Sequence, residues 1–361
     1  MKYKIAIEER VFHFRQPAGT SRGVLTERCS WLVRLTDGLS VGIGECAPLT
    51  YLSCDSLPGY GETLRVKGEA LAAALEQGDE AVAAFLDTLR DYPSMLFGLE
   101  TALCSLRSAQ RQPSPDVERP GTLCFNTAFS RGEVGIPING LVWMGTFDEM
   151  QQRIEEKLAQ GFRCVKLKIG AIDFDSELML IRKIRERFGP REVELRVDAN
   201  GAFSFNDDAL YKLQLLSQYA LHSIEQPIPA RQWTYMAELC RESPLPIALD
   251  EELIGINTPD HKRQMLNIIR PAYIVLKPSL HGGMSGTREW VSIARDMHIG
   301  SWITSALESN VGLNAVAQLC SDVYGDDISM PQGLGTGQLF TDNIPMPLEI
   351  RGDKLWISRP S

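Results

Sequence analysis

Short apolar segments alternate with helix-like segments through more than half of this chain, and this alternation is the strongest constraint on its fold. The ends of the apolar segments recur at a period of roughly 27 residues, enough for one strand, one helix and two loops. A series of about eight such units favours a closed (β/α) barrel. The segment ends are Val142, Lys168, Asp198, Glu225, Asp250, Lys277 and Thr304, and one further step reaches the neighbourhood of Met330.

An open doubly wound sheet is the alternative interpretation of the same alternation. It is disfavoured because no Gly-x-Gly-x-x-Gly motif follows an early strand, where such sheets hold the phosphates of a cofactor. The glycine-rich segment 333–337 lacks the Lys-Ser/Thr pair of a phosphate-binding loop. We therefore predict an α/β fold with a TIM-like (β/α)7β barrel.

The first third of the chain has a different pattern. Residues 4–14, 29–35 and 41–44 are rich in β-forming residues and predict a three-stranded meander. The segment 16–23 between the first two strands contains proline and glycine and is predicted to be a loop. Residues 57–110 then have helical periodicity.

These patterns predict two domains. An α+β domain covers residues 1–125, and the barrel covers residues 126–337. Residues 338–361 are expected to return to the first domain.

Charge and composition exclude several classes of function. The chain has 361 residues and a net charge of −9, which disfavours binding to nucleic acid or to an anionic membrane. No apolar run is long enough to cross a bilayer, and the apolar stretch near the N-terminus is too short for a secretion signal. The eight cysteines form no Cys-x-x-Cys pair, which is typical of reduced thiols in a cytoplasmic protein. The sequence makes no prediction of the oligomeric state.

Charged residues end successive strands that should otherwise be apolar on both faces. They are Lys168, Asp198, Glu225, Asp250 and Lys277, and the carboxyl ends of barrel strands surround one mouth. A single charge there is often only the start of a solvated loop, but a consecutive series with grouped acids indicates a site. Because carboxylates suit a hard divalent cation, we expect Asp198, Glu225 and Asp250 to bind Mg²⁺, with Mn²⁺ as the alternative.

The lysines on either side of the acids indicate proton transfer. Lys166 and Lys168 alternate on one strand, so both side chains point to the same face of the barrel. A neighbouring cation and partial burial favour a neutral lysine that can act as a base, whereas Lys166 alone could equally form a structural ion pair. With a metal and Lys277, these groups predict removal of the proton α to the carboxylate of a small-molecule substrate, and the metal would stabilise the enediolate.

The strand ends carry the motifs Val165-Lys166-Leu167-Lys168-Ile169-Gly170, Asp198-Ala199-Asn200-Gly201, Glu225-Gln226-Pro227, Leu249-Asp250-Glu251 and Leu276-Lys277-Pro278. In these motifs the chain resembles the enolase superfamily, in the muconate-lactonizing-like subgroup with Lys-x-Lys on the second barrel strand. Their order and spacing fit over the whole chain. The resemblance implies that the α+β domain caps the barrel.

Within this subgroup, further segments are similar to the o-succinylbenzoate synthase family of menaquinone biosynthesis. This resemblance implies a syn dehydration of a cyclohexadiene carboxylate to an aromatic product. It implies that Lys168 abstracts the α-proton and returns it to the leaving hydroxyl, and that Lys277 stabilises the enediolate. Asn200 would orient a metal ligand, with Lys166 in support. The similar segments are residues 139–145, 222–227, 280–283 and 304–314.

Several residues are candidates for holding the rest of the substrate. Ser309 or Asn310 precedes a helical pattern and can cap that helix, whose N-terminus would then bind a second substrate carboxylate or simply face solvent. Ser279 and Ser305 are further candidates for substrate binding.

The segment 19–25 and Glu251 are also expected to lie near the mouth of the barrel. The segment 19–25, which contains Arg22, corresponds in the superfamily to a capping-domain loop that closes over the barrel mouth. Arg22 is therefore another candidate for substrate binding. Glu251 follows Asp250 directly, and an ion pair within the loop is at least as good an interpretation of it as a metal ligand.

Two rival functions remain. A racemase of N-succinylamino acids or a dipeptide epimerase would use the same acids, with Lys277 as a second acid/base. A barrel that only binds a ligand, having lost catalysis, is the rival from another class. The retention of both lysines and all the acids speaks against it.

Overall fold

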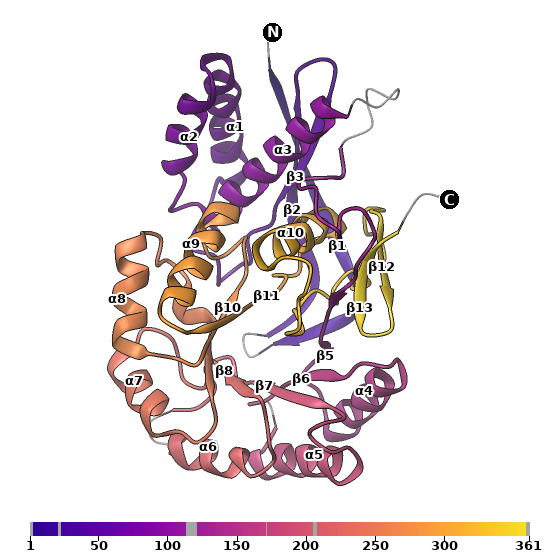
Figure 1. Cartoon of the computed structure of the whole chain (residues 1–361), viewed down its shortest axis with the longest axis vertical. Helices are drawn as coiled ribbons and strands as arrows, with labels where there is room; N and C mark the ends of the chain where they lie inside the picture. The colour runs from indigo at the N-terminus through magenta and orange to yellow at the C-terminus, as the bar shows by residue number, and fades with distance from the viewer. Residues whose placement is uncertain (1–2, 21–22, 113–120, 171, 205–207, 359–361) are drawn as a thin grey trace.

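The computed structural model describes the chain except residues 1–2, 21–22, 113–120, 171, 205–207 and 359–361. The N-terminal domain begins with an antiparallel sheet in the order β1-β2-β3, formed by β1 (Lys4–Thr20), β2 (Gly23–Thr36) and β3 (Val41–Cys46). Helices α1 (Tyr60–Gln77), α2 (Asp79–Asp87) and α3 (Pro93–Arg111) follow and pack beside this sheet (Figure 1).

Glycines allow helix α3 to lie directly on strand β3. A Cβ atom at Gly44 would overlap the carbonyl oxygen of Gly98, and one at Gly98 would overlap the sulfur of Cys46. The start of α3 is fixed by Asp55, whose Oδ2 accepts hydrogen bonds from Ser94 N at 2.9 Å and Ser94 Oγ at 2.6 Å. The domain has a hydrophobic core of its own.

The second domain is a parallel sheet of seven strands in sequential order, each followed by a helix. Residues 332 and 333 connect the two edges of the sheet. Gln332 forms a parallel bridge with Ile138, just before β5, and Gly333 forms one with Thr304, just after β11. The predicted fold class, a (β/α)7β barrel with an N-terminal α+β domain, is confirmed. The strands are β5 (Gly140–Val142), β6 (Cys164–Lys168), β7 (Glu194–Asp198), β8 (Ser223–Glu225), β9 (Ile247–Leu249), β10 (Tyr273–Leu276) and β11 (Gly300–Ile303). The helices are α4 (Phe147–Ala159), α5 (Phe174–Arg187), α6 (Ala209–Ser217), α7 (Trp233–Glu242), α8 (Pro259–Ile269), α9 (Gly283–Asp296) and α10 (Asn310–Tyr324).

The segment after the barrel divides between the two domains. Phe340, in the segment 338–361 that was expected to return to the first domain, packs on Phe12 and Phe14 of β1. The last hairpin is formed by β12 (Leu348–Arg351) and β13 (Lys354–Ile357). It pairs instead with β4 (Ile136–Pro137), the short strand that precedes the first barrel strand in sequence. The prediction was wrong for this hairpin, because the buried side chains of β13 join the barrel core.

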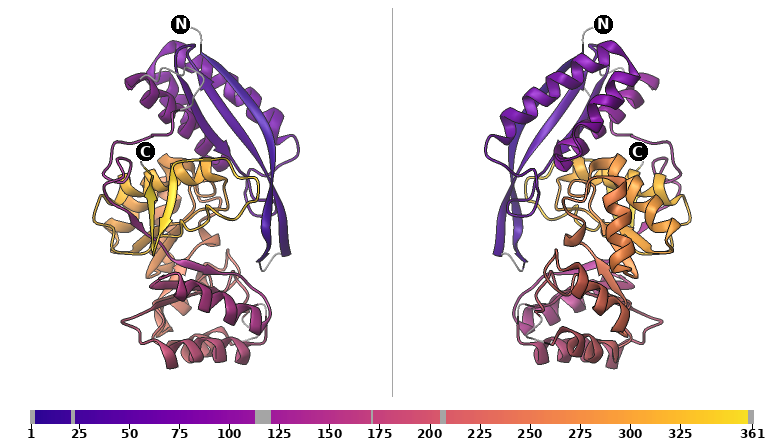
Figure 2. Two further views of the ribbon diagram at one scale, coloured as in Figure 1. Left: turned by 90° about the vertical axis from the view of Figure 1, so that its right-hand side faces the viewer. Right: turned by 90° about the vertical axis from the view of Figure 1, so that its left-hand side faces the viewer.

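The predicted loop at residues 16–23 is largely strand. β1 and β2 pair from Lys4 to Thr20, with one register shift between His13 and Ala18 that accommodates the proline. Phe14 and Ala18 are buried against Phe340, so tertiary contacts override the breaker residues. Figure 2 shows the resulting long hairpin running from the helices of the first domain down beside the barrel.

Two glutamates of the first domain join it to the barrel at helix N-termini. Glu45 on β3 accepts hydrogen bonds from Ser309 N and Gly312 N at the start of α10, each at 2.9 Å. Glu100 on α3 accepts them from Met284 N at 2.5 Å and from the amide of the next residue at 3.1 Å, at the start of α9. Both carboxylates satisfy backbone donors that a helix cannot satisfy itself.

No helix in the described part of the chain is long and apolar enough to span a bilayer.

Candidate active site

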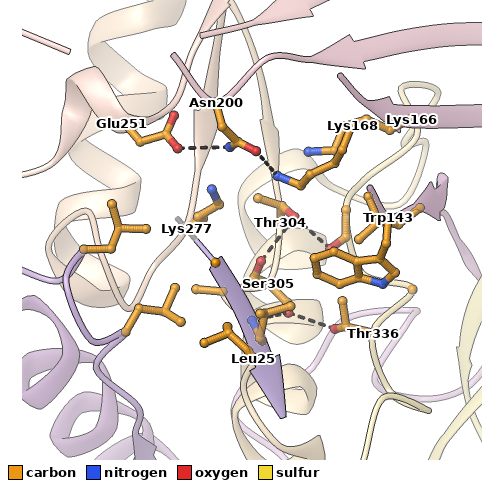
Figure 3. Close-up of a pocket in the computed structure, with 18 of the residues that line it drawn as sticks. Leu25, Trp143, Lys166, Lys168, Asn200, Glu251, Lys277, Thr304, Ser305 and Thr336 are labelled. Atoms are coloured by element: carbon orange, nitrogen blue, oxygen red, sulfur yellow. Dashed lines mark hydrogen bonds between the residues drawn. The ribbon is translucent and has the colours of Figure 1, made fainter. Parts of the chain in front are cut away.

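A cavity of about 260 Å³ lies between the first domain and the carboxyl ends of the barrel strands (Figure 3). The first domain contributes Gly23–Leu25 at the tip of the β1–β2 hairpin and the loop residues 49–52. The barrel contributes the charged strand ends and an uncharged wall. That wall is made of Asn139, Leu141, Trp143, Thr304, Ser305, Ala306, Leu307, Gly333, Gly335 and Thr336.

Lys166 and Lys168 both line the cavity, as their alternation on β6 predicted. Each faces the carboxylates of neighbouring strands. Lys166 Nζ lies 3.2 Å from Asp198 Oδ2 and 2.9 Å from Glu225 Oε2. Lys168 Nζ lies 2.8 Å from Asp198 Oδ2. The parallel register places the end of β6 beside the end of β7, and the end of β7 beside the end of β8.

Lys277 reaches the same space from the far side of the acids. It follows β10, three strands beyond β7 in the sheet, and its ammonium forms an ion pair with Asp250 Oδ2. The ammonium ends of Lys168 and Lys277 approach one volume from different strands (Figure 3). The barrel therefore brings together the charged strand ends that the sequence singled out.

The pKa values of Lys166, Lys277 and Glu225 are all raised within this cluster. Burial lowers the pKa of Lys166, but the carboxylates of Glu225 and Asp198 outweigh it and hold the pKa above the usual range. The pKa of Lys277 is raised in the same way, with Asp250 as its main partner. Burial and the charge of Asp198 raise the pKa of Glu225 to about 8. The expected lowering of a lysine pKa is absent at Lys166, because it faces carboxylates more closely than cations.

Asn200 holds the ammonium of Lys168. Its Oδ1 accepts a hydrogen bond from Lys168 Nζ at 2.6 Å, and its Nδ2 donates to Glu251 Oε1 at 3.0 Å. Only its backbone contacts an expected metal ligand, since Asn200 N donates to Asp198 Oδ1 at 3.1 Å. The side chain thus orients a lysine, where the sequence suggested that it would orient a ligand. Glu251 lines the cavity as part of this chain of contacts.

The residues after β7 and β8 turn sharply. Asn200 has φ 45° and Gln226 has φ 40°, a left-handed conformation that costs energy for residues with a side chain. Gln226 Oε1 accepts hydrogen bonds from Asp250 N and Glu252 N, each at 3.2 Å, and so ties the ends of neighbouring strands together. Local backbone strain at strand ends is typical of functional sites.

The three acids fit a divalent cation by their chemistry. Asp198, Glu225 and Asp250 are buried and offer only oxygen donors. Glu225 Oε1 and Asp250 Oδ1 are buried without a hydrogen-bond partner, which is costly for a carboxylate oxygen unless a cation or water serves it. Among the described residues no set of three such side chains is already gathered around one point, because each acid faces a lysine.

The substrate-binding candidates differ in their positions. Ser305 lines the cavity and accepts a hydrogen bond from Thr336 Oγ1 at 2.8 Å. Ser309 and Asn310 begin α10, but Glu45 already occupies that helix N-terminus, so the sequence prediction of a free anion site there was wrong.

Ser279 is fully buried and its hydroxyl donates to Glu308, so it lies outside the cavity lining. Arg22 lies outside the described residues.

The apolar lining was not recognised in the sequence. Trp143 follows β5 and forms one wall (Figure 3). Leu49 and Leu52 come from a loop of the first domain whose role depends on docking against the barrel, which no local pattern reveals.

Comparisons with known proteins agree with this fold and site. Residues 149–352 match the family described as enolase C-terminal domain-like. The chain therefore belongs to the enolase superfamily, whose members use a divalent metal. Residues 2–106 match the MenC N-terminal domain.

The chain is 46% identical to o-succinylbenzoate synthase from Desulfotalea psychrophila over 96% of each protein. Within the superfamily it belongs to the o-succinylbenzoate synthase family, a group of hydro-lyases. The crystal structure of MenC from Desulfotalea psychrophila LSv54 has a TM-score of 0.83 at 41% identity and covers 99% of this chain and 100% of that one. A dipeptide epimerase from Enterococcus faecalis, at 20% identity and a TM-score of 0.82, shares the fold over 99% of this chain and 98% of its own.

Proposed function

We propose that this chain dehydrates 2-succinyl-6-hydroxy-2,4-cyclohexadiene-1-carboxylate to 2-succinylbenzoate, the reaction named for its family. The observation that carries the proposal is the convergence of Lys168 and Lys277 on one cavity, where both ammonium groups pair with buried acids of the expected metal site. The net charge of −9 and the small volume of the cavity support a small carboxylate as the ligand rather than nucleic acid or a membrane.

The reaction needs one group to move a proton and another to stabilise negative charge. Lys168 Nζ takes the proton from C1, and the electron pair of that C–H bond delocalises into the C1 carboxylate as an enediolate. The C6–OH bond then breaks, and hydroxide leaves as water with the proton returned by Lys168. The ammonium of Lys277 stabilises the enediolate by charge and the ring by cation–π attraction.

Asp198, Glu225 and Asp250 would hold Mg²⁺, with Mn²⁺ as the alternative. When bound, the ion supplies positive charge that stabilises the substrate carboxylate as it gains electrons. The protein's own groups do the rest. Asn200 keeps Lys168 directed into the cavity, and the tip of the β1–β2 hairpin with residues 49–52 covers the cavity from the first domain and limits access of water.

A second candidate is racemisation of N-succinylamino acids. The chain is 29% identical to an N-succinylamino acid racemase from Thermus thermophilus over 81% of its length, and Lys277 is placed to act as a second acid/base. Turnover of the dienoic substrate with Mg²⁺, followed by its ultraviolet change, tests the first function. Deuterium exchange at Cα of N-succinylamino acids in D₂O, with no dehydration activity, would favour the second.

We place the protein in the cytoplasm. All eight cysteines are free, which supports a reducing compartment.

A further inference from the structure

A buried arginine connects two loops that form opposite parts of the cavity lining. Arg28 lies on β2 and is only 5% exposed. One of its terminal nitrogens donates to the carbonyl oxygen of Ala306, and the other donates to the carbonyl oxygen of Ala47. Ala47 belongs to the first domain and Ala306 to the barrel, so a single guanidinium joins the two domains at the cavity.

Both acceptors stand in segments that contact the cavity. We call residues 47–53 the cap loop and residues 304–309 the barrel loop. Four consecutive residues of the cap loop, 49–52, line the cavity, and so do residues 304–307 of the barrel loop. Strand β2 itself begins at the cavity with Gly23, Val24 and Leu25. Arg28 thus lies where three parts of the lining converge.

The groups around Arg28 suit a cation that donates hydrogen bonds from two separate nitrogen atoms. Glu308 and Glu45 supply the nearest negative charges, but each carboxylate is committed to other groups. Glu308 Oε2 accepts a hydrogen bond from Ala306 N at 2.7 Å, and Glu45 is bound to the start of α10. Both backbone polar groups of Ala306 are therefore held in place, the N–H by Glu308 and the carbonyl oxygen by Arg28. A lysine has a single ammonium and lacks the planar fork that reaches both carbonyls.

We propose that Arg28 is a positioning residue that sets the separation of the cap loop and the barrel loop, and thereby the fit of the part of the substrate remote from Lys168. This rests on the proposed function for the nature of the substrate. Lys168, Lys277 and Asn200 come from strand ends that Arg28 does not contact. Loosening the bridge should therefore weaken substrate binding more than it slows the chemical step.

The test compares Arg28→Lys with a matched control, Arg34→Lys, at an exposed position of the same strand. We expect Arg28→Lys to raise KM for the dienoic substrate about tenfold, with kcat within about threefold of the wild type. Arg34→Lys should leave both unchanged. A KM for Arg28→Lys within about twofold of the wild type, whatever its thermal stability, would overturn the proposal.

Hydrogen exchange of the substrate-free protein gives a readout that does not depend on activity. Amides of the cap loop and the barrel loop should exchange several-fold faster in Arg28→Lys, and in both loops together, while the α8 amides are unaffected. Faster exchange in one loop only, or equally throughout the molecule, would mean that Arg28 is merely structural. If the wild type does not turn over the dienoic substrate, the proposed function fails, and the exchange pattern still decides whether Arg28 ties the loops together.

Discussion

The side-chain oxygen of Asn200 accepts a hydrogen bond from the ammonium of Lys168 over 2.6 Å. The same amide donates to Glu251 Oε1, so the orientation of Asn200 is fixed from both ends. Lys168 Nζ therefore has a defined place between Asn200 and Asp198 Oδ2. A base held in this way loses little entropy when it meets its substrate.

Asn200→Ala should reduce kcat by roughly 10- to 100-fold with a smaller effect on KM, because its main consequence is to free Lys168. Steady-state kinetics with the dienoic substrate measure the effect. Asn267→Ala, at an exposed position of α8, is the control. A kcat for Asn200→Ala equal to that of the wild type would show that Asn200 does not position the base.

The barrel and its charged mouth were predictable because both depend on local pattern. Each strand is short, most of the helices are amphipathic, and parallel register alone brings Lys168 beside Asp198. The acids and lysines therefore converge wherever such a barrel closes. Their pairing with one another is not written in any local pattern, since it depends on side-chain orientation within the closed barrel.

Long-range contacts explain what local pattern missed. The N-terminus of α10 looked free for a substrate anion, yet Glu45, which is 264 residues from Ser309 in sequence, already binds it. Likewise, burial of Phe14 against Phe340 converts a proline-containing segment into strand. In both cases the deciding partner comes from the other domain or from the far end of the chain.

Glu45→Gln should destabilise the protein by about 2 kcal/mol. The carboxylate accepts four hydrogen bonds, from Ser30 Oγ, Ser309 N, Ser309 Oγ and Gly312 N. A glutamine places an NH₂ group against some of these donors and leaves them unsatisfied. Urea unfolding measures the loss, with Glu27→Gln at an exposed site of β2 as control. Equal stability of the two variants would contradict a capping role for Glu45.

Glu100 should make stability fall as pH rises through neutrality. Burial raises its pKa from 4.5 to about 7, although hydrogen bonds from Ser285 and Met284 oppose the shift. The folded protein thus holds this proton more tightly than the unfolded chain. The stabilisation that comes from this bound proton is fully present below about pH 4.5 and is lost as the pH rises through about 7. The loss is at most roughly 3 kcal/mol, and it is smaller where solvent reaches the carboxyl group.

The measurement is the unfolding free energy of the wild type and of Glu100→Gln between pH 5 and pH 8. The substitution also alters the hydrogen bonds at the start of α9, but that cost does not depend on pH. The difference between the two proteins should therefore shift with pH in favour of the variant as pH rises. Parallel curves would mean that the pKa of Glu100 is the same in the folded and unfolded states.

Added Mg²⁺ should raise the unfolding temperature of the wild type and not that of Asp250→Asn. A ligand that binds only the folded state adds about 2.7 kcal/mol at a concentration one hundred times its Kd. Asp250 is a proposed ligand whose buried Oδ1 has no hydrogen-bond partner, and an amide in its place offers no charge to the ion. Asp260→Asn, at the exposed start of α8, should keep the full shift. An equal Mg²⁺ effect in Asp250→Asn would place the ion elsewhere on the protein.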